Sequence, residues 1–123
     1  MIVDSSILLA ILFEEPNCAW AEERLMERTG TLCMSTVNLT EVLIRLRDRK
    51  PADFAELEDQ LLHCGIEYVP PDLEQARIAA EARLRFPLNL GDCFAYALAR
   101  VRNQGIMTLD ADFRALDVPV LLP

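Results

Sequence analysis

Residues 1–13 read MIVDSSILLAILF, and this opening places an acid between two apolar segments. Residues 1–4 form a short apolar run that ends in Asp4, as expected of a buried strand. Residues 5–14 are apolar on nearly every side, which predicts a buried helix that ends before Pro16, because proline interrupts helical hydrogen bonding. The opening therefore predicts a strand followed directly by a helix, with Asp4 at their junction.

Outward from this unit, short apolar runs continue to alternate with segments of helical length. The helix with the clearest pattern carries Leu39, Val42, Leu43 and Leu46 at the spacing of an amphipathic stripe. Such alternation is typical of an α/β fold with a parallel sheet covered on both faces. The predicted strands are 31–35, 66–69, 106–109 and 118–122, and the predicted helices are 17–28, 36–50, 52–64, 72–86 and 91–102, with a short turn at 111–115.

Length and composition predict a single domain spanning residues 1–123. The chain is 52% hydrophobic and 26% charged, so it can bury a substantial core and does not resemble a disordered protein. No secretory signal is recognisable after Met1, and the apolar run Ile7–Phe13 is far shorter than the roughly 20 residues that cross a bilayer. We therefore expect a cytoplasmic protein that does not act at a membrane.

The cysteines and the single histidine argue against several kinds of site. The four cysteines are widely spaced and contain no C-x-x-C pair, so we expect reduced, mostly buried thiols rather than disulfides or a zinc site. They are Cys18, Cys33, Cys64 and Cys93. His63 lies in no recognisable motif and is interpreted as an exposed helix residue, which disfavours a catalytic triad.

Four acids stand where parallel-sheet proteins bind their ligands. Asp4 and Asp110 follow predicted strands, whereas Glu41 and Asp92 lie in the first turns of predicted helices. The topology of such sheets brings these positions to one edge. Carboxylates this close raise one another's pKa unless a cation is present, and hard oxygen ligands suit Mg²⁺ or Mn²⁺.

Each acid also has a purely structural interpretation. Asp4, Asp92 and Asp110 are placed to cap helices or turns, and Glu41 can be a solvated helix residue. For any one acid the two interpretations are evenly matched. The joint placement of all four favours a metal site.

The formal net charge of −8 counts against a nucleic-acid partner, because phosphate binding requires Lys and Arg. Two features weaken that objection. Four of the acids belong to the expected metal pocket, where bound cations reverse the local field. Basic residues also fall together at Arg45, Arg47, Arg49 and Lys50.

Four blocks of sequence surround the acids: MIVDSS at 1–6, STVNLTEV at 35–42, LGDCFAYALA at 90–99 and TLDADF at 108–113. In this order they resemble the PIN-domain ribonucleases, and the third block is similar to the most recognisable block of VapC-type toxins of type II toxin–antitoxin systems. The resemblance spans essentially the whole chain. It implies a PIN-like three-layer α/β/α sandwich around a mostly parallel sheet of four or five strands.

The resemblance also implies a site and a reaction. Asp4 and Asp92 match the principal metal ligands, and Glu41 and Asp110 complete the catalytic, metal-binding quartet. Ser6 matches a supporting hydroxyl. Asp112 fits the variable last block less well than Asp110 does. The implied reaction is hydrolysis of RNA with one or two Mg²⁺ or Mn²⁺ ions, which polarise the phosphate and activate a water.

The implied partners are RNA, a cognate antitoxin and a second copy of the chain. Antitoxins of this family lay an apolar helix in a groove, and Ile7–Phe13 with Trp20, Leu25 and Met26 exceeds what one side of a small core needs. For any single one of these residues, a place in the ordinary core is the favoured interpretation. Two other functions stay open: a housekeeping PIN nuclease without an antitoxin, and a non-catalytic α/β module that binds a protein.

Overall fold

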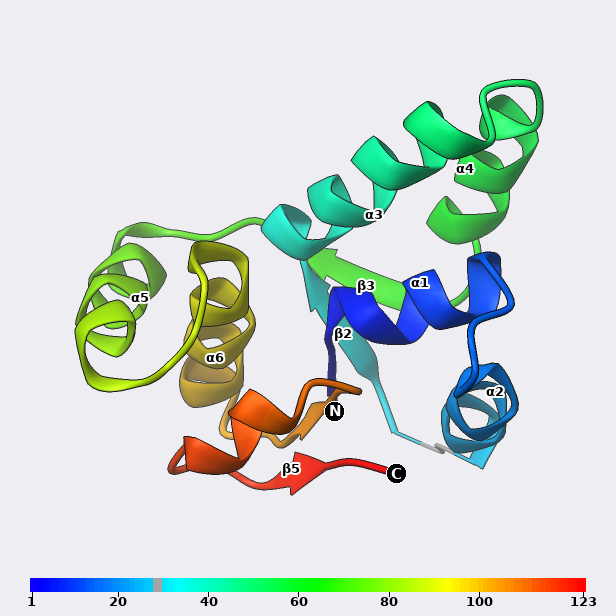
Figure 1. Cartoon of the computed structure of the whole chain (residues 1–123). Helices are drawn as coiled ribbons and strands as arrows, with labels where there is room; N and C mark the ends of the chain where they lie inside the picture. Colours follow the sequence, from blue (N-terminus) through cyan, green and yellow to red (C-terminus); the bar gives the residue numbers. More distant parts are fainter. Residues whose placement is uncertain (28–29) are drawn as a thin grey trace.

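The chain folds around one sheet of five strands, shown in Figure 1 as a computed structural model that describes residues 1–27 and 30–123. The strands lie in the order β3-β2-β1-β4-β5, and every pairing between neighbours in this sheet is parallel. β1 is therefore central, with β2 and β4 on either side. The strands are β1 (Ile2–Val3), β2 (Leu32–Ser35), β3 (Ile66–Val69), β4 (Ile106–Met107) and β5 (Val120–Leu121).

Helices connect the strands and cover both faces of the sheet. Apolar side chains of α1 to α4 pack on one face, and those of α5, α6 and η1 pack on the other. The three-layer α/β/α fold predicted from the sequence is confirmed. The helices are α1 (Ser5–Leu12), α2 (Cys18–Glu27), α3 (Thr36–Arg49), α4 (Phe54–Leu62), α5 (Leu73–Arg85), α6 (Leu90–Arg102) and the 3₁₀ helix η1 (Ala111–Ala115).

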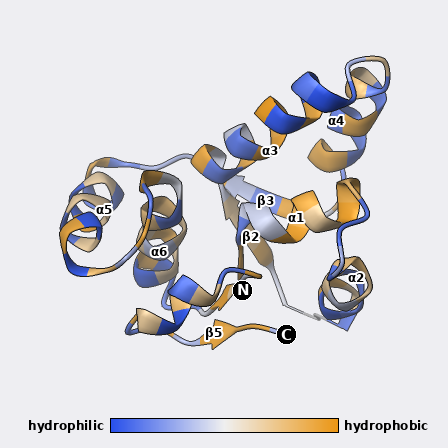
Figure 2. Ribbon diagram, viewed as in Figure 1, coloured by the Kyte–Doolittle hydropathy of each residue, from blue (hydrophilic) through white to orange (hydrophobic). Residues whose placement is uncertain are grey.

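Residues alternate along the strands between the two buried clusters, because successive strand side chains point to opposite faces. Ile2 belongs to the cluster beneath α5 and α6, and Val3 belongs to the cluster beneath α1 and α3. The same alternation separates Cys33 from Met34 in β2. Figure 2 shows apolar residues along α1 beyond its first turn, in agreement with the predicted buried helix.

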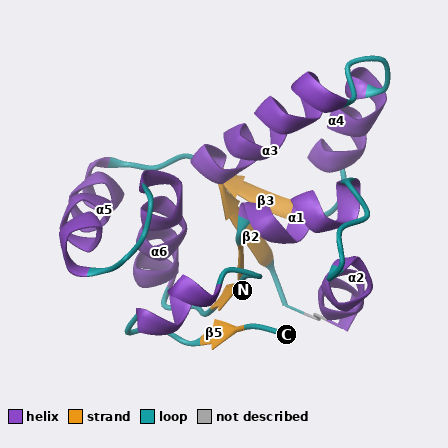
Figure 3. Cartoon of the chain, viewed as in Figure 1, coloured by secondary structure: helices purple, strands orange, loops and turns teal. Residues whose placement is uncertain are grey.

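The predicted elements are present, with boundaries that differ by a few residues (Figure 3). The strand predicted for 106–109 ends at Met107, because Thr108 turns the chain by accepting a hydrogen bond from the Asp110 N–H at 3.0 Å. The helix predicted for 17–28 is α2, which ends at Glu27, and residue 28 lies outside the described residues.

All four cysteines are free thiols, and the prediction that they are mostly buried holds only in part. Cys33 and Cys93 are buried and Cys18 is half-buried, whereas Cys64 is exposed because it lies in the turn between α4 and β3. His63, at the end of α4, has a side chain that is 74% exposed, as predicted. Within residues 1–27 and 30–123, no helix has the length and hydrophobicity needed to cross a membrane.

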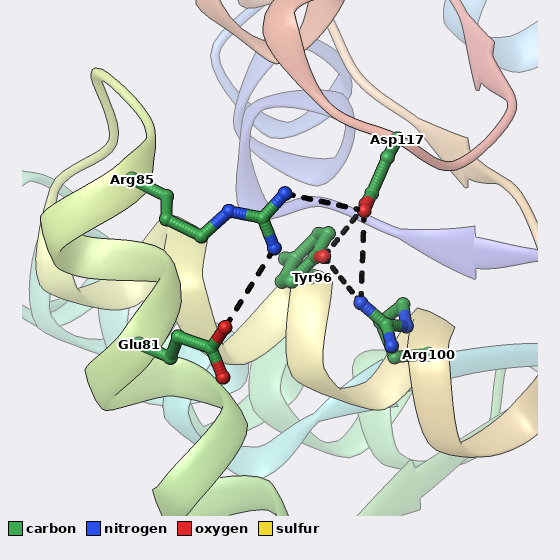
Figure 4. Close-up of polar contacts among 5 residues, drawn as sticks. All are labelled: Glu81, Arg85, Tyr96, Arg100 and Asp117. Atoms are coloured by element: carbon green, nitrogen blue, oxygen red, sulfur yellow. Dashed lines mark hydrogen bonds and ion pairs between the residues drawn. The ribbon is translucent and has the colours of Figure 1, made fainter.

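A polar cluster fixes α6 to its neighbours (Figure 4). The hydroxyl of Tyr96, a residue 2% exposed, donates to Asp117 Oδ1 at 2.6 Å and accepts from Arg100 at 2.7 Å. Arg85 of α5 lies 3.7 Å from the other oxygen of Asp117. The cluster thus joins α5, α6 and the segment before β5, and it supports the helix that carries Asp92.

Candidate active site

Asp4 lies at the carboxyl end of β1 and caps α1. Its Oδ2 accepts hydrogen bonds from the hydroxyls of Ser6 at 2.6 Å and Thr108 at 2.9 Å, and Ser6 Oγ accepts from the Leu109 N–H at 3.0 Å. Asp4 is 2% exposed, and its Oδ1 is buried without a hydrogen-bond partner among the described residues. An unpaired carboxylate oxygen is unfavourable in a protein interior, so Oδ1 suits a cationic partner.

Asp110 reaches the same edge from the end of β4. Thr108 Oγ1 accepts a hydrogen bond from the Asp110 N–H and also donates to Asp4, so one threonine joins the two acids. Asp110 Oδ1 accepts from the Asp112 N–H at 2.9 Å and thereby caps η1. Asp112 itself is exposed in this turn.

Asp92 lies in the first turn of α6 as part of a capping box. Asn89 Oδ1 accepts from the Asp92 N–H at 2.9 Å, and Asp92 Oδ2 accepts from the Asn89 N–H at 3.3 Å. The residue is 8% exposed. One oxygen of the carboxylate is therefore held at the positive end of α6, and the side chain is largely shielded from water.

Glu41 reaches the edge from α3. Its Oε1 accepts from Asn38 Nδ2 at 2.9 Å and from the Ser5 hydroxyl at 3.2 Å. Asn38 is 0% exposed and also donates to the Gly91 carbonyl at 2.9 Å, so it connects α3 to the start of α6. A Cβ added at Gly91 would lie 2.5 Å from Glu41 Oε2, which means that the carboxylate packs directly on the glycine.

Burial and the neighbouring acids change the pKa values of Asp4 and Asp92. Burial and repulsion from Asp4 raise the pKa of Asp92 to about 7, with smaller contributions from Asp110 and Glu41. Burial also raises the pKa of Asp4 above its ordinary value; repulsion from Glu41 adds to the rise, and hydrogen bonds from two hydroxyls oppose it. The structure thus places all four acids at one edge of the sheet.

The capping interpretation of the aspartates is confirmed. Asp4 caps α1, Asp92 belongs to the capping box of α6, and Asp110 caps η1. A carboxylate has two oxygens, and a cap bond occupies one of them. Capping therefore orients each aspartate at the edge and is compatible with a shared ligand.

The donors suit a hard divalent cation. Among the residues that the structure describes, no group of three or more acidic, cysteine or histidine side chains is arranged to hold a metal ion. Mg²⁺ does not need one, because it keeps several waters and takes one or two protein carboxylates. The unpartnered Oδ1 of Asp4 and the raised pKa of Asp92 fit such an ion, since its charge would offset burial and repulsion.

Three residues that shape this edge were not singled out from the sequence: Asn38, Thr108 and Gly91. Asn38 lies three positions before Glu41, a spacing that places both on one helix face. Thr108 is a polar residue directly after an apolar strand. These two signals are present in the sequence, whereas the close approach of Gly91 to Glu41 exists only in three dimensions.

Comparisons with known proteins agree with this fold. The model of the PIN domain matches residues 1–119, and the chain belongs to the PIN-domain family. Within that family it is a VapC ribonuclease relative. It is 34% identical to the VapC ribonuclease Mb2780c of Mycobacterium bovis, with 96% of each chain covered. It is 33% identical to Ribonuclease VapC30 of Mycobacterium tuberculosis, with 100% of each covered.

Solved structures share the fold at lower sequence identity. VapC20 of Mycobacterium tuberculosis, described as a Sarcin-Ricin loop cleaving toxin, superposes with a TM-score of 0.84 at 18% identity, covering 99% of this chain and 98% of that one. A toxin–antitoxin complex from Klebsiella pneumoniae gives a TM-score of 0.78 at 18% identity, with coverage of 98% and 94%. The three-layer architecture is therefore that of known toxins.

Gly91→Ala is expected to slow RNA cleavage about tenfold, or about 1.4 kcal/mol in activation free energy, because the new methyl group displaces the Glu41 carboxylate. The fold should persist, since the displaced atoms end a flexible side chain and alanine favours helix. Single-turnover cleavage rates measure the effect. Gly30→Ala is the control, because a Cβ there meets nothing within 4 Å. Equal rates for both variants would show that Glu41 placement is unimportant.

Proposed function

We propose that this chain, a single PIN domain over residues 1–123, is a Mg²⁺- or Mn²⁺-dependent ribonuclease that acts as the toxin of a toxin–antitoxin pair in the cytoplasm. The observation that carries the proposal is the buried edge where Asp4, Glu41, Asp92 and Asp110 meet. Relatives named VapC ribonucleases support the same activity.

Each side chain at this edge has a distinct role. Asp4 and Asp92 would hold the divalent cation, which supplies Lewis acidity toward the phosphate and a water of lowered pKa. Ser6 and Thr108 fix the Asp4 carboxylate through hydrogen bonds. Glu41, itself held by Asn38, orients the attacking water, and Asp110 binds further water at the rim.

The experiment that tests this activity incubates the purified protein with total cellular RNA in Mg²⁺, in Mn²⁺ or in chelator, and maps the ends of the fragments. We expect defined cuts with either metal and none with chelator. Equal cutting in chelator would refute metal dependence. An absence of cutting under all conditions would refute the nuclease and favour a protein-binding module.

An apolar groove on the face of α1, α2 and α4 supports a helical partner. The groove encloses about 340 Å³. Grooves of this kind bind the apolar face of an amphipathic helix, and the solved complexes of relatives include toxin–antitoxin pairs. We propose that a cognate antitoxin helix occupies it. Residues lining the groove are Leu8, Ile11, Leu12, Leu25, Met26, Leu57 and Leu61.

Met26→Asp is expected to weaken inhibition by the antitoxin at least about tenfold, because a carboxylate would be buried against the apolar helix. Met26 is 86% exposed, so the substitution should leave the fold and RNA cleavage intact. Titration of cleavage with the antitoxin encoded beside this gene measures the effect, with Met26→Leu as control. Unchanged inhibition of Met26→Asp would refute this docking site.

The absence of such a neighbouring gene would favour a housekeeping nuclease instead. The homodimer implied by the family resemblance remains a proposal of the same kind. Sedimentation equilibrium of the isolated chain tests it, and a single species with the mass of one chain would refute it.

A further inference from the structure

Beside the acidic edge lies a second pocket that the proposed chemistry leaves unused. A cavity of about 290 Å³ is bounded by Ser6 and Asp110 on the side of the acids and by Glu15, Asn17 and Arg45 on the other. Most of its lining residues are polar or charged, in contrast to the groove proposed for the antitoxin. The pocket therefore borders the acidic edge, since Ser6 and Asp110 line it.

Arg45 is the cation of this pocket. It lies four residues after Glu41 on α3, so both side chains project from one face of the helix. Its guanidinium Nη2 is 3.8 Å from Glu15 Oε1, longer than a charge-assisted hydrogen bond, and this oxygen is buried without a hydrogen-bond partner in the described part of the chain. The Arg45 side chain is 38% exposed. Its guanidinium carbon also lies 5.2 Å from the centroid of the Phe13 ring. Arg45 thus contacts one ring face and an acid that does not fully satisfy it.

Two neighbouring basic residues of the cluster noted in the sequence, Arg47 and Lys50, make contacts elsewhere. The Arg47 guanidinium lies over the Phe54 ring, 4.1 Å from its centroid. Lys50 Nζ donates to the Leu12 carbonyl at 2.9 Å. The members of the cluster therefore make different contacts in the structure, and Arg45 is the member that lines the pocket.

We propose that this pocket binds a backbone phosphate of the RNA next to the scissile one, with Arg45 as the main ligand. The inference rests on the proposed function. RNA must approach four carboxylates on a chain of net charge −8, so a cation beside them is needed to hold the backbone. A guanidinium presents forked donors that match phosphate oxygens. On binding, the phosphate takes the place of Glu15 as the partner of Arg45.

The experiment measures binding of fluorescent single-stranded RNA to proteins that also carry Asp92→Asn, so that cleavage does not interfere. At about 50 mM salt, Arg45→Ala should raise the Kd about five- to tenfold and reduce the slope of log Kd against log salt by about 0.7, the value for one lost phosphate contact. Arg47→Ala, on the same helix, should change neither quantity. Glu15→Gln should lower the Kd, because it removes the anion that competes for Arg45.

An unchanged slope in Arg45→Ala, or equal losses in Arg45→Ala and Arg47→Ala, would overturn the proposal. Weaker RNA binding by Glu15→Gln would also overturn it, since the pair would then act as a structural unit. The result that would refute the proposed function is distinct from the results that would refute the phosphate pocket. A protein that binds RNA through Arg45 but cuts none with metal would refute the nuclease and retain this phosphate pocket.

Discussion

Asp92→Asn is expected to cleave RNA at least about a thousandfold more slowly than the wild type, equivalent to about 4 kcal/mol of lost transition-state stabilisation. The substitution removes a negative ligand of the proposed cation from the centre of the acidic edge. The amide oxygen can still accept the hydrogen bond from the Asn89 N–H, so α6 should keep its cap. Single-turnover cleavage at a mapped site measures the effect.

Asp112→Asn is the matched control for this loss. Asp112 is an exposed acid two residues beyond Asp110, and its replacement should leave cleavage unchanged. Asp4→Asn should behave like Asp92→Asn. If both of these variants cut RNA as the wild type does, the acids serve only as helix caps and the chain is a non-catalytic module.

The metal-free protein is expected to lose stability as pH rises, and Asp92→Asn should remove much of that loss. The pKa of Asp92 in the folded protein is about 7, above its ordinary value of 3.8. The folded state therefore favours the protonated group. The contribution of Asp92 to the free energy of unfolding therefore keeps its full value below pH 3.8 and falls as pH rises through about 7. The difference between the two pKa values corresponds to about 4 kcal/mol in the free energy of unfolding. We expect about 2 kcal/mol of this after solvent screening.

Urea unfolding of both proteins in chelator, at a series of pH values, measures this effect. The difference in free energy of unfolding between Asp92→Asn and the wild type should increase with pH. Asp92→Asn should be the more stable protein under alkaline conditions. Asp117→Asn should show the opposite sign, because the hydrogen bond from Tyr96 lowers the pKa of Asp117. An Asp92→Asn protein no more stable than the wild type at alkaline pH would show that neither burial nor repulsion from the other acids penalises the Asp92 carboxylate.

The sequence predicts that the four acids lie at one edge of the sheet, because that placement depends on topology. With β1 before Asp4 and α1 after it, the parallel arrangement places the strand ends at one edge. Glu41 and Asp92 follow from the same rule, since each lies in the first turns of a helix that starts at that edge. These placements require only the order and type of the elements.

Details that depend on side-chain packing cannot be predicted from the sequence. The bond from Asn38 to the Gly91 carbonyl joins positions 53 residues apart, and no local pattern specifies it. The sequence does not separate the members of the basic cluster, whereas in the structure Arg47 lies over the Phe54 ring and Arg45 lines the pocket. Cys64 was expected among the buried thiols, but the turn after α4 leaves it exposed. Tertiary contacts decide such features.

The claim that Asp4 and Asp92 share a divalent cation is tested most directly by calorimetric titration of Mn²⁺ into the metal-free protein near neutral pH. We predict at least one Mn²⁺ bound per chain with release of protons, because a carboxyl with a pKa of about 7 must deprotonate to bind metal. Asp4→Asn and Asp92→Asn should each weaken binding at least about tenfold. Binding of equal affinity in all three proteins would contradict the account.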